Sequence, residues 1–91
     1  MHALQLPATL MHAQANACRH QWVQAMRGAP ADAAWVVDAS ALTEFDSSAL
    51  AVLLACRRQA RSIGQSFRVQ HMPPKLQELA SLYGVSALLG A

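Results

Sequence analysis

The sequence predicts an α/β fold in which a small, mostly parallel or mixed sheet of about four strands is combined with three to four helices. Two observations lead to it: the continuous apolar run AWVVDA at residues 34–39, and a strand-then-helix order that repeats along the chain. Such alternation gives parallel strands joined by right-handed crossovers. Functional side chains are then expected where strand ends meet helix starts.

The first part of the chain is predicted to form one strand and one helix. Within residues 1–10, leucines alternate with polar or small residues, which indicates a short strand, and Pro7 places this strand at a sheet edge or ends it early. Over residues 10–27, apolar residues recur at spacings of three and four, which predicts a helix with Thr9 as its N-cap.

The middle of the chain is predicted to form a central strand and a second helix. Residues 34–39 have the continuous apolar character of a strand that is covered on both faces. Residues 47–62 carry leucines on one side and arginines on the other, as in a helix with a buried face. Asp46 is expected to cap this helix and Gly64 to close it.

The last part of the chain is predicted to form a third strand and a third helix. Residues 66–72 alternate apolar and polar side chains, which is typical of a strand. Pro74 suits the first turn of a helix, and Gly84 is expected to end that helix. The apolar tail that follows, with Val85, Leu88 and Leu89, should pack back on the core.

Length and composition favour a single domain over residues 1–91. The chain is 54% hydrophobic and 13% charged, which excludes a disordered tail and leaves apolar surface available to a partner. The net charge is only +2, and outside Arg57, Arg58 and Arg61 the basic residues are scattered, so no nucleic-acid partner is expected. The longest apolar run, residues 49–56, is too short to span a membrane.

A cytoplasmic protein is expected, unless a partner holds it at a membrane. The first residues lack the charged segment and apolar run of a signal peptide. Cys18 and Cys56 lie in apolar helical stretches and are expected to be reduced core residues.

No catalytic or metal site is predicted, and no cofactor. His12 and His20 lie on one predicted helix but about 12 Å apart along it, too far for one ion. The chain has no nucleophile elbow, phosphate-binding loop or dinucleotide fingerprint. Three carboxylates lie within nine positions, those of Asp38, Glu44 and Asp46. A helix-capping role accounts for the presence of Asp46 among them.

The motif Asp46-Ser47-Ser48 places two hydroxyl groups in the first turn of a helix behind an acidic cap. Free N–H groups and the helix dipole favour added negative charge there, so the helix would tolerate a phosphate on Ser47. Such a phosphate would add a charge of about −2 at the surface. Capping alone explains the motif equally well.

The stretches WVVDAS (35–40) and FDSSALAVLL (45–54) resemble the STAS domain family. This family includes anti-sigma-factor antagonists, the cytoplasmic tails of anion transporters, and a small subunit of the bacterial Mla phospholipid ABC transporter. Its hallmark is a strand that ends in Asp-x-Ser, a short connection, and then Asp-Ser-Ser-Gly-Leu or Asp-Thr-x-Gly-Leu at the start of a helix. The chain departs from it by having Ala49 in place of the glycine and a first strand that is shortened.

The segment LQELASLYGV (76–85) is most similar to the Mla-type members. The resemblance implies a non-catalytic protein that binds and supports the ATP-binding subunit of a phospholipid ABC transporter. The alternative that it implies is an anti-sigma-factor antagonist, switched by phosphorylation of Ser47, whose partner is an anti-sigma kinase.

Under either alternative, the partner is expected to bind around the start of the second helix. The residues predicted for this surface are Asp46, Ser47, Ser48, Val52 and Arg58, with Ser47 as the candidate switch. The shortened first strand could also leave an open sheet edge that pairs with a second copy of the chain.

Overall fold

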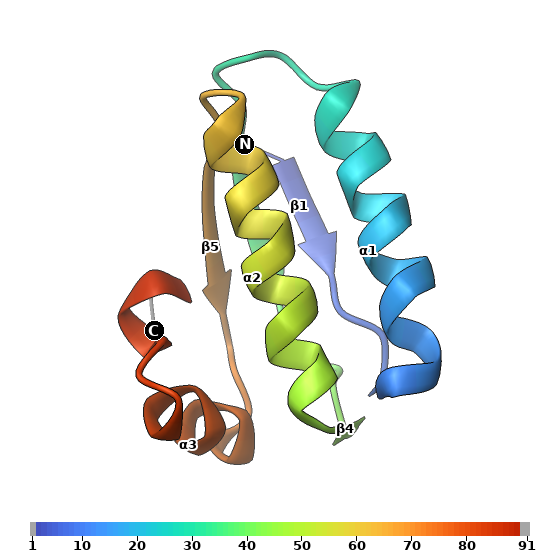
Figure 1. Cartoon of the computed structure of the whole chain (residues 1–91), viewed down its shortest axis with the longest axis vertical. Helices are drawn as coiled ribbons and strands as arrows, with labels where there is room; N and C mark the ends of the chain where they lie inside the picture. Colours follow the sequence, from blue (N-terminus) through green and yellow to red (C-terminus); the bar gives the residue numbers. More distant parts are fainter. Residues whose placement is uncertain (1, 90–91) are drawn as a thin grey trace.

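The computed structural model describes residues 2–89, and its strands and helices alternate as predicted (Figure 1). In chain order the elements are β1 (His2–Gln5), β2 (Thr9–Leu10), α1 (His12–Arg27), β3 (Ala34–Asp38), β4 (Glu44–Phe45), α2 (Ser47–Ser62), β5 (Ser66–Gln70), α3 (Pro74–Leu82) and the 3₁₀ helix η1 (Ser86–Leu89). These residues therefore contain five short strands, where about four were expected.

The strands form two parallel sheets. β1, β3 and β5 make a three-stranded sheet with β3 in the middle, as predicted for residues 34–39. β2 and β4 make a separate two-stranded pair. The single strand expected over residues 1–10 is thus divided in two, because Pro7 has no N–H with which to continue the ladder. Met1, which that prediction included, lies outside the described residues.

Both long helices cover the same face of the three-stranded sheet, where they lie side by side (Figure 1). On that face, Leu4, Val37 and Val69 are neighbours across the three strands. They belong to the same core as Met26 of α1 and Leu53 of α2, both of which are fully buried. Because side chains alternate along a strand, Ala3, Val36 and Arg68 form a row on the other face.

The helix ends agree with the sequence predictions except at α1. Thr9 is not the N-cap of α1, because it lies in β2 and the cap position belongs to Met11. α2 spans the predicted residues, and α3 begins at Pro74. After α2, Gly64 adopts a left-handed φ of 82°, and the N–H of Gln65 donates back to the carbonyl of Ala60. This is the helix-ending geometry that glycine favours.

A buried glutamine holds together the end of the sheet where the strands begin. The side-chain N–H of Trp35 donates to Oε1 of Gln65 at 2.7 Å. Nε2 of Gln65 donates to the carbonyls of Met26 and Pro30, each at 3.0 Å. Gln65 thereby connects β3, the end of α1 and the loop that follows α1.

The apolar tail packs on the core as predicted, because Leu89 in η1 is fully buried. Leu88 beside it remains 43% exposed. Within residues 2–89, none of the helices has the length and apolar character needed to cross a membrane.

Candidate functional site

Asp38 stabilises the loop that follows β3. Its Oδ1 accepts a hydrogen bond from the backbone N–H of Ser40 at 2.9 Å and lies 3.3 Å from Nδ1 of His71. The hydrogen bond from Ser40, aided by His71, lowers the pKa of the Asp38 carboxyl. The carboxylate is therefore ionised at neutral pH and accepts hydrogen bonds, which suits a loop-forming role rather than that of a proton donor.

Asp46 caps two helices at once. Its Oδ1 accepts from the backbone N–H of Ser48 in α2 at 2.8 Å, as predicted, and its Oδ2 accepts from the backbone N–H of His12 in α1 at 3.2 Å. The pairing of β2 with β4 makes this possible, because it brings the starts of both helices together. These hydrogen bonds, with that of Ser48 first, lower the pKa of the Asp46 carboxyl.

We expect removal of the Asp46 carboxylate to destabilise the fold in a pH-dependent way. Asp46→Ala should lower the urea midpoint near neutral pH, because both helix starts lose an acceptor. Folding lowers the pKa of the Asp46 carboxyl. The contribution of this carboxylate to the stability of the fold is therefore complete above the unfolded-state pKa of about 4, and it is lost as the pH falls through the folded-state pKa.

Urea titrations at neutral and acidic pH measure this effect, with Asp46→Asn as the control. Asparagine keeps one acceptor oxygen but has no carboxyl to titrate, so it should restore part of the midpoint without the pH dependence. A midpoint for Asp46→Ala equal to that of the wild type at neutral pH would show that the carboxylate does not cap the helices.

Ser47 is exposed and lies at the rim of a hollow between the start of α2 and α3. This hollow, called here the Ser47 hollow, has a volume of about 480 Å³. Its lining residues are Phe45, Asp46, Ser47, Lys75, Glu78, Leu79 and Leu82. An exposed hydroxyl thus lies in a hollow that also has apolar side chains and Lys75 in its lining, which is an arrangement suited to binding a partner surface.

Large exposed apolar side chains lie in this hollow and next to it. Leu82 is 78% exposed, and its neighbour Tyr83 is 58% exposed. Met11, 39% exposed, lines a second hollow that shares Phe45 and Lys75 with the first. Exposed apolar side chains gathered in this way mark a surface that a partner can cover.

The structure brings together only some of the residues predicted for docking. Asp46, Ser47 and the half-buried Ser48 lie together at the start of α2. Val52 is 2% exposed and belongs to the core, so its prediction as a surface contact is wrong. The apolar face of α2 turns Val52 toward the protein interior. Arg58 is eleven residues from Ser47, about 16 Å along the helix, and lines a different groove.

Several residues of this surface were not predicted from the sequence. Lys75, Leu79 and Leu82 belong to α3, and only the tertiary packing of α3 against the start of α2 brings them beside Ser47. Leu82 lies in a leucine-rich helix, and only the folded structure shows that its side chain is exposed.

Ala49, which replaces the family glycine, is fully buried in the first turn of α2. The helix accommodates its methyl group in the core cluster. The start of α2 is therefore a regular, packed helical turn.

Burial raises the pKa of both cysteine thiols. Cys56 is fully buried, and burial raises the pKa of its thiol to about 12, so it stays protonated. Burial also raises the pKa of the half-buried Cys18. Within residues 2–89, no three His, Cys, Asp or Glu side chains are grouped so that they could hold a metal ion.

Comparison with known proteins identifies the family. A family model described as "Mlab, STAS domain" matches residues 2–90. The chain belongs to this STAS family, as the sequence resemblance suggested.

Among solved structures, the chain is similar to an anti-sigma-factor antagonist (STAS) domain protein from Planctomyces limnophilus. The match has a TM-score of 0.79 and 17% sequence identity, and it covers 94% of this chain and 76% of the other. At this identity the likeness establishes the STAS fold. No curated protein shows significant sequence similarity to the chain.

Proposed function

We propose that this protein is a non-catalytic docking subunit that binds and supports the ATP-binding subunit of an Mla-type phospholipid ABC transporter. The proposal rests on one observation above all: the exposed Ser47 stands beside an apolar surface formed by Phe45, Leu79 and Leu82. The match to the Mlab-type family model supports this choice of partner. On this proposal the protein acts in the cytoplasm, at the inner membrane, through its partner.

A second candidate function is that of an anti-sigma-factor antagonist. The fold match to such a protein supports it, and so does the position of Lys75 in the Ser47 hollow. An ammonium group there could pair with a phosphate on Ser47. In this case the partner would be an anti-sigma kinase, released when Ser47 is phosphorylated.

Isolation of the tagged protein from native membranes distinguishes the two candidates. The transporter proposal predicts that an ATP-binding subunit and its permease copurify with the tagged chain. Recovery of an anti-sigma kinase instead, with no transporter subunit, would support the second candidate and contradict the first.

Negative charge at Ser47 is expected to weaken docking without unfolding the protein. Ser47→Glu should reduce the affinity for the copurified partner about tenfold or more, because it buries an extra charge at the contact. The fold should survive, since a helix N-terminus favours negative charge. Titration calorimetry with the purified partner measures the change.

Two control variants isolate the effect of position and charge. Ser47→Ala removes the hydroxyl without adding charge and should bind nearly as well as the wild type. Ser66→Glu adds the same charge at an exposed residue of β5, outside the Ser47 hollow, and should also bind normally. Equal affinities for Ser47→Glu and the wild type would place the docking surface elsewhere.

A further inference from the structure

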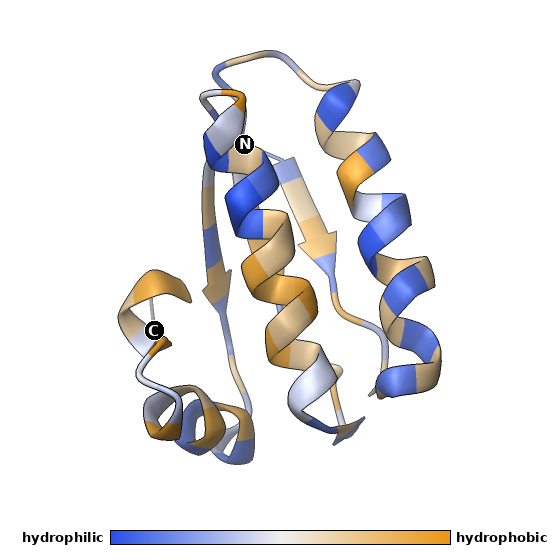
Figure 2. Cartoon of the chain, in the orientation of Figure 1, coloured by the Kyte–Doolittle hydropathy of each residue, from blue (hydrophilic) through white to orange (hydrophobic). Residues whose placement is uncertain are grey.

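A groove between α1 and α2 is lined by three arginines that the Ser47 surface does not use. Arg19, Arg27 and Arg58 are all exposed and line a groove of about 360 Å³ between the two helices. We call it the arginine groove. Figure 2 shows that hydrophilic residues dominate this part of the molecule, along α1 and in the second half of α2.

The groove follows the helix repeat on both sides. On α1 it is lined by Arg19, Val23 and Arg27, which are four residues apart and therefore lie one above another. On α2 it is lined by Ala55, Arg58, Gln59 and Ser62, which share one helix face at spacings of three and four. The two helices run in the same direction (Figure 1), so the groove is straight and about two helical turns long.

The groove combines cationic walls with small side chains. Val23 is half-buried between the arginines of α1, and Ala55 faces it from α2. Small side chains in such a furrow permit the close approach of a third helix, as in ridge-into-groove packing. The guanidinium groups on either side would then meet the flanks of that helix.

Among residues 2–89, no carboxylate forms an ion pair with these arginines. None of the residues that line the groove is acidic. Within residues 2–89, the one contact between a basic and an acidic side chain is that of His71 with Asp38, at the far end of the sheet. Arg27 lies in the last turn of α1, where a cation interacts favourably with the free carbonyls, but Arg19 and Arg58 have no such role.

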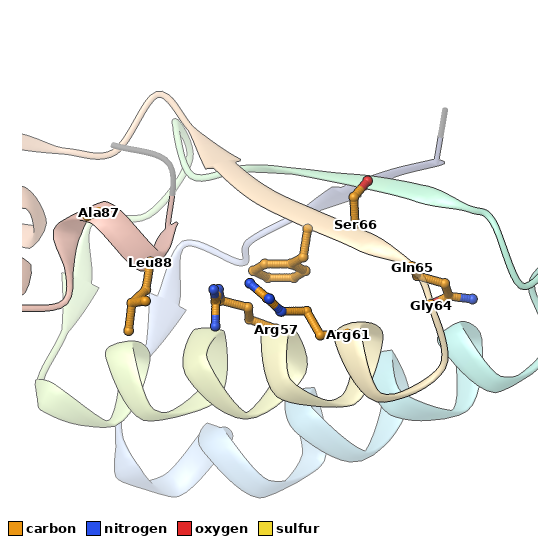
Figure 3. Close-up of a pocket in the computed structure, with 8 residues that line it drawn as sticks. Arg57, Arg61, Gly64, Gln65, Ser66, Ala87 and Leu88 are labelled. Carbon is orange, nitrogen blue, oxygen red and sulfur yellow. The ribbon is translucent and has the colours of Figure 1, made fainter.

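The positive charge continues on the other flank of α2. Arg57 and Arg61 line a separate hollow between α2 and β5, and Figure 3 shows both side chains reaching from the helix toward that strand. The second half of α2 therefore presents arginines on both flanks. Like charges gathered in this way repel one another, and an anionic ligand would relieve the repulsion.

The shape of the groove favours an acidic helix over other anions. Arg19 and Arg27 are about 12 Å apart along α1, so a single phosphate group would not engage the full line of charge. The large exposed apolar residues Met11, Leu82, Tyr83 and Leu88 all lie outside the groove, so it lacks the side chains with which a protein inserts into a lipid surface.

We propose that the arginine groove binds an acidic amphipathic helix of a protein partner, in which acidic residues flank a stripe of small residues. Arg58 lies about 16 Å along α2 from Ser47, so this contact is separate from the Ser47 hollow. The proposal requires that the ligand is a protein. It does not require that this protein is the transporter subunit proposed above. The same partner could engage both surfaces.

The test uses a capped synthetic peptide of alanine and glutamate in which two rows of glutamates flank a stripe of alanines along the helix, added to the ¹⁵N-labelled protein. NMR titration should shift the amide signals of residues 19–27 and 55–62. Arg19→Gln combined with Arg58→Gln should weaken binding about tenfold or more, because two charge-assisted contacts are lost. Raising the salt concentration should also weaken binding.

Matched controls make the result specific to the groove. Arg68→Gln removes an exposed arginine from the opposite face of the sheet and should bind like the wild type. Ser47→Glu should also leave peptide binding unchanged, which separates this test from that of the proposed function. A peptide of the same composition with its glutamates scrambled around the helix should bind more weakly.

Several results would overturn the proposal. These are equal binding of the striped and scrambled peptides, unchanged affinity in the double arginine variant, and amide shifts that map outside the groove. Preferential binding of anionic phosphatidylglycerol vesicles or inorganic phosphate at these arginines would also overturn it, and would assign the groove to lipid or to free phosphate.

Discussion

Val52→Asp is expected to unfold the protein. Val52 is 2% exposed and packs in the core cluster beneath α2. An aspartate there would bury a carboxylate that has no partner, at a cost of more than about 4 kcal/mol in the free energy of unfolding. Since the whole stability of a small domain is about 5–15 kcal/mol, little would remain. Circular dichroism during a urea titration measures the loss.

The neighbouring residue provides the control. Ala51 precedes Val52 on α2 but is exposed, so Ala51→Asp should leave the urea midpoint almost unchanged. A folded Val52→Asp protein with a midpoint close to that of the wild type would contradict the burial of Val52. Because unfolding alone would abolish docking, Val52→Asp cannot be used to locate the docking surface.

Leu82→Asp is expected to cause the largest loss of docking among variants that still fold. Leu82 is 78% exposed, so a charge there should not disturb the core, but it would fall in the apolar part of the Ser47 hollow. We expect the affinity for the partner to fall by about two orders of magnitude, as for an apolar residue at the centre of an interface.

Calorimetric titration of the isolated partner measures this loss. Leu88→Asp is the control, because Leu88 is also an exposed leucine but lines the hollow beside Arg57 and Arg61 instead. If Leu82→Asp bound the partner as tightly as Leu88→Asp does, α3 would not be part of the docking surface.

The features of the fold that could be predicted are those coded by neighbouring residues. The bounds of α2, its cap at Asp46 and the start of α3 at Pro74 are local signals, and all are confirmed. The apolar run at residues 34–39 identified the central strand for the same reason. Two-residue strands such as β4 carry too few residues to show a pattern, so the pairing of β2 with β4 was missed.

The features that could not be predicted depend on contacts between distant residues. Gln65 reads as an ordinary polar residue after a glycine, yet it makes the buried hydrogen bonds that join Trp35 to the end of α1. Asp46 was predicted to cap one helix, and only the β2–β4 pairing lets it cap two. The second cap therefore has no signal in the residues around Asp46.

The same reasoning explains which parts of the candidate site were predicted. Ser47 follows an acidic cap at a helix start, and this local motif was sufficient to single it out. Val52 and Arg58 were assigned to the same surface because they lie on the same helix. Burial separates Val52 from Ser47, and the length of α2 separates Arg58 from it. The apolar part contributed by α3 required the folded arrangement.

The most direct test of docking to an ATP-binding subunit is the melting temperature of that purified subunit with and without this protein. A partner that binds only the folded state stabilises it, by about 2.7 kcal/mol at a hundredfold excess over Kd. We predict a higher melting temperature with the wild type and with Leu88→Asp, and little or no rise with Leu82→Asp. An unchanged melting temperature in the presence of excess wild-type protein would contradict the proposed function.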